Sequence, residues 1–369
     1  MDQPLKKILD EMAATLKEGS WIPAPEWARD MAVFIATPEG TIAAIDNEMH
    51  LGSASEMVAS LLGSAGVPMR EGDAVVSNDP YMGSPHVQDF FLLAPVYHKG
   101  KLCVYLGAKS HLRDIGGDVE GGFNSRAEEI WAEGVRITPV KICRQDRTDI
   151  GILNMILLNS RAPASVRKGL ESLIEAVQSG RKEVLSCLQG AGAVEGLHRD
   201  VEKIIGDTEG RLRELVAGWP NGEYSGECAV DDDSVRLRGL KIELKLLIRD
   251  SQVEIDLSMN RPQVKAPFNS SRGNTLSFAL LPFFPLLDGG QSVNGGIWRI
   301  VTVRTKKGTL VDPLLPAPTS LSPFHVGREI SGAVRTAMEK FLLQEEKERL
   351  AKGVPSLINW HPKGQVSLV

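Results

Sequence analysis

A chain of 369 residues can bury a large hydrophobic core, and its length allows one to three domains. Hydrophobic residues make up 42% of the sequence and charged residues 24%, which is typical of a soluble globular protein. The formal net charge of -5 gives no basic surface of the kind that nucleic-acid-binding proteins carry, so we expect no nucleic-acid partner.

The N-terminal segment predicts a charged amphipathic helix over residues 4–18, because its apolar residues recur at helical spacing. A segment of this kind is not a secretory signal peptide. The longest apolar stretch, Leu276–Leu287, contains two prolines and is too short to cross a bilayer. The four cysteines form no C-x-x-C pair, which argues against a zinc ribbon or a disulfide framework. We therefore expect a cytoplasmic protein without a membrane partner.

Strands and helices alternate over the next part of the chain. Residues 32–35 and 41–45 predict a β-hairpin, and residues 53–65 predict a helix with Ser53 or Ser55 as its N-cap.

The predicted strand Ala74–Ser77 leads into the corner Asn78-Asp79-Pro80-Tyr81. Pro80 fixes its own φ and restricts Asp79 to an extended conformation, so the carboxylate of Asp79 is held in a defined direction. A capped turn is the simpler interpretation of Asp79; a metal ligand, an orienting group or a catalytic carboxylate are the alternatives.

Two apolar runs follow, at residues 90–96 and 102–106, and we expect them to pair through the turn at residues 98–101. Residues that precede the first strand and residues that follow the second then lie at the same end of the hairpin. That end gathers four side chains with metal-binding groups: His86, Asp89, His111 and Asp114. Two imidazoles with one or two carboxylates are typical of a divalent-metal site, although hydrogen-bonded polar structure beside a turn is the alternative.

The remaining sequence changes character at the turn Trp219-Pro220-Asn221-Gly222, which is the candidate domain boundary. We therefore divide the chain into residues 1–218, which would hold the metal site and a helical region, and residues 219–369, mainly strands and a last helix.

Together these patterns predict an α+β fold with mixed β-sheet and helical segments. The elements expected after the central hairpin are a helix at 127–133, an extended segment at 135–142, helices over 148–218, strands over 222–260, a buried helix at 275–287, a hairpin at 299–304 and 309–311, and a helix at 328–352.

Familiar catalytic fingerprints are missing from the sequence. It contains neither G-x-x-x-x-G-K-[ST] nor a G-x-G-x-x-G after a strand, so no nucleotide-binding motif is found. It also lacks a G-x-S-x-G elbow, which argues against a serine hydrolase of the α/β-hydrolase type.

Taken in order, the polar motifs resemble those of the hydantoinase B/oxoprolinase family, which also provides the corresponding subunit of acetone and acetophenone carboxylases. The central motifs are Gly72-Asp73, Asn78-Asp79-Pro80-Tyr81-Met82-Gly83, His86-x-x-Asp89 and His111-x-x-Asp114-Ile115-Gly116-Gly117. Further matches are Arg29-Asp30, His50-Leu51-Gly52-Ser53, the segment 133–141, Asn159-Ser160-Arg161, Gln263-Val264-x-x-Pro267-x-Asn269 and Asn294-x-Gly296.

Three departures from the family pattern limit what can be transferred. Leu112 stands where the family usually has a second adjacent histidine, and the loop after Gly117 lacks the usual Pro-Gly-Ser stretch. The family also continues into a glycine-rich C-terminal region that this sequence does not contain. We therefore expect a hydantoinase B-like fold shortened at its C-terminus, either completed by another subunit or inactive.

The resemblance implies a B-type subunit that acts with an A-type ATPase subunit in a hetero-oligomer. The A-type subunit would use ATP to phosphorylate a cyclic amide, such as a hydantoin or 5-oxoproline, and the B-type subunit would open the activated ring. A ketone carboxylase subunit and a non-catalytic scaffold are the alternatives. The expected metal ligands are His86, Asp89 and His111 for zinc, manganese or iron, with Asp79 and Asp114 as catalytic carboxylates that orient the ligands or the nucleophilic water. Leu276–Leu287 is a candidate subunit contact, with a buried helix as the alternative.

Overall fold

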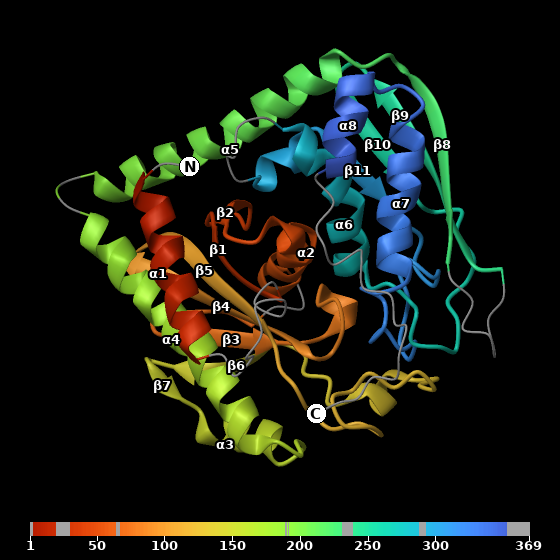
Figure 1. Ribbon diagram of the computed structural model, residues 1–369. Helices are drawn as coiled ribbons and strands as arrows, with labels where there is room; N and C mark the ends of the chain where they lie inside the picture. The colour runs from red at the N-terminus through yellow and green to blue at the C-terminus, as the bar shows by residue number, and fades with distance from the viewer. Residues whose placement is uncertain are drawn as a thin grey trace.

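A seven-stranded sheet forms the centre of the N-terminal part in the computed structural model (Figure 1). The strand order is β2-β1-β5-β4-β3-β6-β7, and every neighbouring pair is antiparallel. The strands are β1 (Met31–Ala36), β2 (Ile42–Ile45), β3 (Ala74–Ser77), β4 (Asp89–His98), β5 (Lys101–His111), β6 (Val140–Arg144) and β7 (Arg147–Thr148). The structure describes residues 3–19, 30–63, 67–188, 190, 192–230, 239–287 and 293–352.

Both faces of the central strands are buried, which explains why β1, β2 and most of β4 are continuously apolar. In β1, Phe34 contributes to one hydrophobic cluster and Val33 to the other, as the alternation of side chains along a strand requires. The same alternation places Phe91 and Phe90 of β4 on opposite faces.

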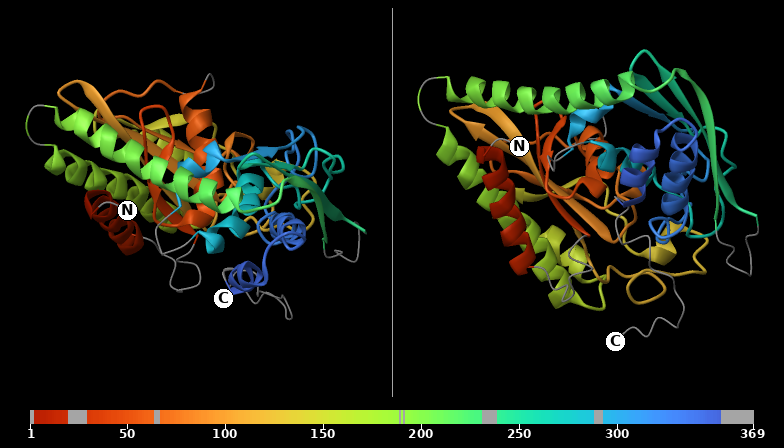
Figure 2. Two further views of the ribbon diagram at one scale, coloured as in Figure 1. Left: turned by 90° about the horizontal axis from the view of Figure 1, so that it is seen from above. Right: turned by 45° about the horizontal axis from the view of Figure 1, so that its top comes forward.

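Helices close the sheet on each side. The face that carries Val33 and Phe90 packs against α1 (Gln3–Gly19), α3 (Ile150–Leu157) and α4 (Pro163–Cys187). The face that carries Phe34 and Phe91 packs against α2 (Leu51–Leu62). The long helix α5 (Ala193–Ala217) contributes Val201 to the cluster that contains Val33 and Leu212 to the cluster that contains Phe34. Figure 2 shows this helix running from beside α4 toward the other sheet.

The second sheet has four strands in the order β11-β10-β9-β8, of which only β10 and β11 are parallel. The helix α7 packs on β8 and β9 and covers the buried face of this sheet, while alternate residues of β9 point to the more exposed face. The elements of this part are β8 (Gly222–Ala229), β9 (Lys241–Arg249), β10 (Gln252–Asp256), α6 (Arg272–Leu280), β11 (Val301–Arg304), α7 (Val326–Met338) and α8 (Gln344–Lys352).

One hydrophobic cluster joins the two sheets. It contains residues from both sides of the proposed boundary at residue 218, for example Phe34 of β1 and Leu246 of β9. The division at residue 218 therefore stays a proposal about how the chain is organised. Within the described residues, none of the helices combines the length and the apolar composition that crossing a membrane demands.

Most predicted elements are confirmed, including the N-terminal helix, the first hairpin and the strand at 74–77. The predicted N-cap of α2 is wrong, because the helix already begins at Leu51 and the hydroxyl of Ser53 donates to the carbonyl of His50. The segment predicted as a helix at 127–133 holds only a 3-10 turn, Ile130–Glu133. Arg29 and the polar tail at 353–369 lie outside the described residues.

Two predictions in the C-terminal part are also wrong. The segment 309–311 does not pair with β11; Thr309 bridges to Pro262 and Asp312, while β11 pairs with β10. The predicted long last helix is divided into α7 and α8.

The stretch Leu276–Leu287 belongs to the core, since Leu280 and Phe283 have no exposed surface. It is therefore not an exposed contact patch, and the alternative of a buried segment holds.

Candidate metal centre

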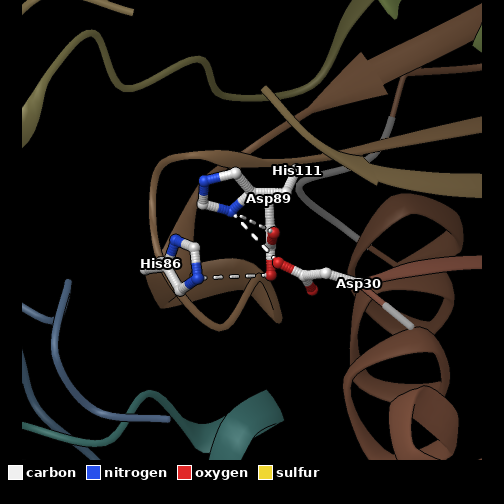
Figure 3. Close-up of side chains that lie close together, drawn as sticks. All are labelled: Asp30, His86, Asp89 and His111. Atoms are coloured by element: carbon white, nitrogen blue, oxygen red, sulfur yellow. Dashed lines mark ion pairs between the residues drawn. The ribbon is translucent and has the colours of Figure 1, made fainter. Parts of the chain in front are cut away.

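Four side chains meet where β4 begins and β5 ends: Asp30, His86, Asp89 and His111 (Figure 3). Each offers one ligand atom, and these atoms all lie within 4.8 Å of one another. Asp89 and His111 are direct partners in the antiparallel ladder, which confirms the predicted hairpin and the approach of its two ends.

The neighbouring strand supplies Asp30. Because β1 pairs with β5 through Met31 and Ser110, Asp30 continues the ladder beside His111, whose backbone N–H donates to the Asp30 carbonyl at 3.4 Å. The Nδ1 atom of His111 lies 3.2 Å from Asp30 Oδ2 and 3.3 Å from Asp89 Oδ1. On the other side, His86 Nε2 lies 3.6 Å from Asp89 Oδ2.

A buried ammonium group balances part of the carboxylate charge. Lys109 has no exposed surface, and its Nζ pairs with Asp30 and, at 3.0 Å, with Asp89 Oδ1. Burial opposes ionisation of both carboxyls, yet Lys109 and the histidines hold the pKa of Asp30 well below its usual range and lower the pKa of Asp89. The centre therefore keeps two carboxylates ionised inside the protein.

The two imidazoles differ in protonation. Burial disfavours the imidazolium form of His111, but hydrogen bonds to Asp30 and Asp89 outweigh it and raise its pKa to about 9. For His86, burial dominates and lowers the pKa, so His86 is neutral at pH 7.

The tautomer of His86 follows from its hydrogen-bond partners. The Nε2 amide of Gln88 donates to the carbonyl of Glu133 at 2.9 Å, so its Oε1 faces His86 Nδ1 at 2.8 Å as an acceptor. His86 Nδ1 must then carry the proton, which leaves a lone pair on Nε2. This lone pair and the Asp89 carboxylate are both electron donors, an arrangement that a shared metal cation stabilises.

Asp79 is held by other partners and is not part of the four-residue group. Its Oδ1 accepts a hydrogen bond from the backbone N–H of Tyr81, and its Oδ2 pairs with Arg136 at 2.8 Å. Burial raises its pKa despite the guanidinium. The capped-turn interpretation of this residue is therefore confirmed.

Asp114 is also absent from the group, so the prediction that the hairpin end brings it together with the histidines is wrong. The chain turns away after β5, and the Asp114 carboxylate accepts hydrogen bonds from the backbone N–H groups of Gly116, Gly121 and Arg161. Burial opposes ionisation, but these donors lower its pKa. Asp114 thus fixes the loop that follows β5.

Sequence reasoning missed Asp30 and Lys109 as members of the centre. Lys109 stands two residues before His111 in an apolar strand, and side chains two apart share a face, so the spacing itself was a usable signal. Asp30 was noted only as part of a short motif, because its place beside His111 depends on the pairing of β1 with β5. His50 also borders the centre, with Nε2 3.8 Å from Asp30 Oδ1.

Another buried carboxyl, that of Glu133, is expected to make stability depend on pH. Burial raises its pKa to about 7 from 4.5, although the N–H groups of Thr319 and Ser320 stabilise the ionised form. The unfolded chain loses this proton near pH 4.5 and the folded protein near pH 7, so the contribution of Glu133 to stability falls as pH rises through that window.

The test is urea unfolding of the wild type and of Glu133→Gln between pH 4 and 8, since glutamine does not titrate. The free energy of unfolding of the wild type minus that of the variant should fall by up to about 3 kcal/mol from pH 4.5 to 7. A difference that stays constant over this range would contradict the raised pKa.

Comparison with known proteins identifies the family. The hydantoinase B/oxoprolinase profile matches residues 1–360. The chain belongs to this family. It is 32% identical over 334 residues to caprolactamase subunit beta of Pseudomonas jessenii, an alignment that covers 89% of this chain and 57% of the relative. It is 25% identical to the acetophenone carboxylase delta subunit of Aromatoleum aromaticum, over 85% of this chain and 46% of the relative.

A solved structure supports the same conclusion for the fold. The crystal structure of ATP-dependent caprolactamase from Pseudomonas jessenii superposes with a TM-score of 0.83 and 30% identity, covering 91% of this chain and 58% of the other. The mixed fold of helices and sheets that the sequence predicted is confirmed. This family member spans about half of the length of the relatives it matches.

Proposed function

We propose that this chain is the metal-dependent B-type subunit of an ATP-dependent enzyme that opens a cyclic amide. The observation that carries the proposal is the cluster of two histidines and two aspartates at the end of the β4–β5 hairpin. The similarity to caprolactamase subunit beta supports the cyclic amide as substrate class, and it supports an A-type ATPase subunit as partner in a hetero-oligomer.

The donor set fits zinc, manganese or iron, because all three accept imidazole and carboxylate ligands. His86, Asp89 and His111 would hold the metal, with a carboxylate oxygen of Asp30 as a fourth ligand. A bound divalent metal supplies a Lewis acid and lowers the pKa of a coordinated water. Gln88 keeps His86 in the tautomer that presents Nε2 to the centre.

The remaining residues of the site have supporting roles in this proposal. Lys109 offsets the charge of the two carboxylates and holds them in place. Asp79 orients Arg136, and Asp114 orients the loop after β5, so both would shape the space around the nucleophilic water from a distance. A cytoplasmic location follows from the same proposal, since its partner consumes ATP.

The isolated chain is expected neither to bind nor to hydrolyse ATP, because its sequence contains no phosphate-binding loop. Calorimetric titration with Mg-ATP and a phosphate-release assay on the purified chain measure both properties. Stoichiometric ATP binding, or ATP turnover that persists through further purification, would contradict the division of labour between two subunits.

The reaction itself is tested by co-expressing the chain with an A-type ATPase subunit encoded beside it. The purified complex is assayed for ATP turnover with lactams, hydantoins and ketones, with and without bicarbonate. Amide-dependent turnover with a ring-opened product supports the proposal. Ketone- and bicarbonate-dependent turnover would favour carboxylation, which the similarity to acetophenone carboxylase motivates. A complex that forms the ring-opened product equally fast with His86→Ala and His111→Ala variants would indicate a scaffold.

A further inference from the structure

Two phenyl rings lie beside the metal centre, and one of them contacts both of its imidazoles. Phe123 is stacked on His111, with ring centroids 5.6 Å apart and an interplanar angle of 5°, and its centroid lies 5.9 Å from that of His86. Phe324 packs edge-on against Phe123 at 5.7 Å. Both phenyl rings are half-buried, whereas both imidazoles are buried, so the phenyl rings present apolar surface beside the centre.

The loop that carries Phe123 is fixed in place. Asp114 accepts a hydrogen bond from the N–H of Gly121 at 3.2 Å. Gly122 has a φ of +75°, and a Cβ atom there would lie only 1.8 Å from Nε2 of Gln88. Glycine at this position therefore lets the loop approach the side chain that orients the centre.

The segment that leads to Phe324 is fixed by a different carboxyl. Glu133 accepts hydrogen bonds from the backbone N–H groups of Thr319, at 3.0 Å, and Ser320, at 2.8 Å. The carbonyl of Glu133 also accepts a hydrogen bond from Gln88, which contacts His86. Glu133 therefore helps to position both this segment and one of the histidine ligands. The two phenyl rings, which come from segments 200 residues apart, thus hold a defined position relative to the imidazoles.

We propose that Phe123 and Phe324 form an aromatic wall that binds the hydrocarbon part of the substrate ring. This inference rests on the proposed function, which places a cyclic amide at the metal centre. Aromatic faces make favourable dispersion contacts with methylene groups but offer no hydrogen bond to a carboxylate. The wall therefore selects uncharged lactams with methylene-rich rings, such as ε-caprolactam, over lactams that carry a carboxylate, such as 5-oxoproline.

The test measures contact between phenyl rings and ligand directly. The chain is prepared in deuterated form with protonated phenylalanine rings, and saturation transfer to ε-caprolactam or 5-oxoproline is recorded by NMR, together with the dissociation constants. Phe123→Ala and Phe324→Ala are each expected to weaken ε-caprolactam binding about tenfold, the loss expected when about two methylene groups lose apolar contact. Phe123→Leu, which keeps apolar volume, should retain most of the affinity.

Tyr97→Ala is the matched control, since Tyr97 is a half-buried aromatic residue at the opposite end of β4. It should leave binding unchanged. Three results would overturn the proposed aromatic wall. They are wild-type affinity for ε-caprolactam in both Phe→Ala variants, no saturation transfer to ε-caprolactam, or tighter binding of 5-oxoproline than of ε-caprolactam. Metal content is measured on the same samples. If the metal-free wild type still shows contact between the phenyl rings and ε-caprolactam, the result counts against the proposed function. If the metal-loaded wild type shows no such contact, the result counts only against the aromatic wall.

Discussion

Replacing His86 or His111 with alanine is expected to lower the affinity of the chain for a divalent metal by at least about a hundredfold. Each substitution removes one imidazole from a centre in which every ligand atom lies within 4.8 Å of the others. His111 also contacts both Asp30 and Asp89, so its loss removes one of the side chains that position these carboxylates. Elemental analysis after dialysis and titration with a competing chelator measure the effect.

His98→Ala is the matched control for both variants. His98 is the last residue of β4, next to the turn at the other end of the same hairpin, and is only half-buried. Its substitution should leave metal content and affinity as in the wild type. Undiminished, stoichiometric metal in His86→Ala and His111→Ala would show that the metal, if bound, is held elsewhere.

The second large effect is expected for Lys109→Met, which should lower the free energy of unfolding of the metal-free chain by about 3–5 kcal/mol. The methionine keeps much of the side-chain volume but removes the buried ammonium group between Asp30 and Asp89. Two carboxylates then face each other inside the protein without their main counter-charge, and the destabilisation reflects that uncompensated burial. Urea unfolding in the presence of chelator measures it.

Lys101→Met offers a control on the same strand, because Lys101 is also ion-paired but exposed, with Glu195 as its partner. Solvent screens an exposed pair of this kind, so the free energy of unfolding of this variant should be close to that of the wild type. Added zinc or manganese should restore part of the stability of Lys109→Met, since a divalent cation can replace the ammonium charge. If both lysine variants unfold alike, Lys109 does not hold the centre together.

The hairpin that builds the centre could be predicted from the sequence because its information is local. Two apolar runs joined by a short turn fix which residues share an end, and this placed His86, Asp89 and His111 together. Asp114 was placed wrongly by the same reasoning, since a strand pattern does not show where the chain turns after its last residue. This carboxylate accepts hydrogen bonds from the N–H groups of Gly121, in the loop itself, and of Arg161, which is distant along the chain.

Features that depend on non-local pairing could not be predicted in this way. Asp30 reaches the centre only because β1 pairs with β5, about 80 positions later in the chain, and no local pattern specifies that partner. The same reason explains the error in the C-terminal part, where β11 pairs in parallel with β10 and not with the segment 309–311. The apolar stretch 276–287 was ambiguous for a further reason: composition alone does not distinguish a buried helix from an exposed contact.

Anomalous X-ray diffraction of zinc- or manganese-loaded crystals, recorded on both sides of the metal absorption edge, tests the central claim most directly. We predict one strong anomalous peak per chain, at about 2.0–2.3 Å from His86 Nε2 and from ligand atoms of Asp89 and His111. No peak at this position, or a strong peak at another set of side chains, would contradict the assignment of the metal centre.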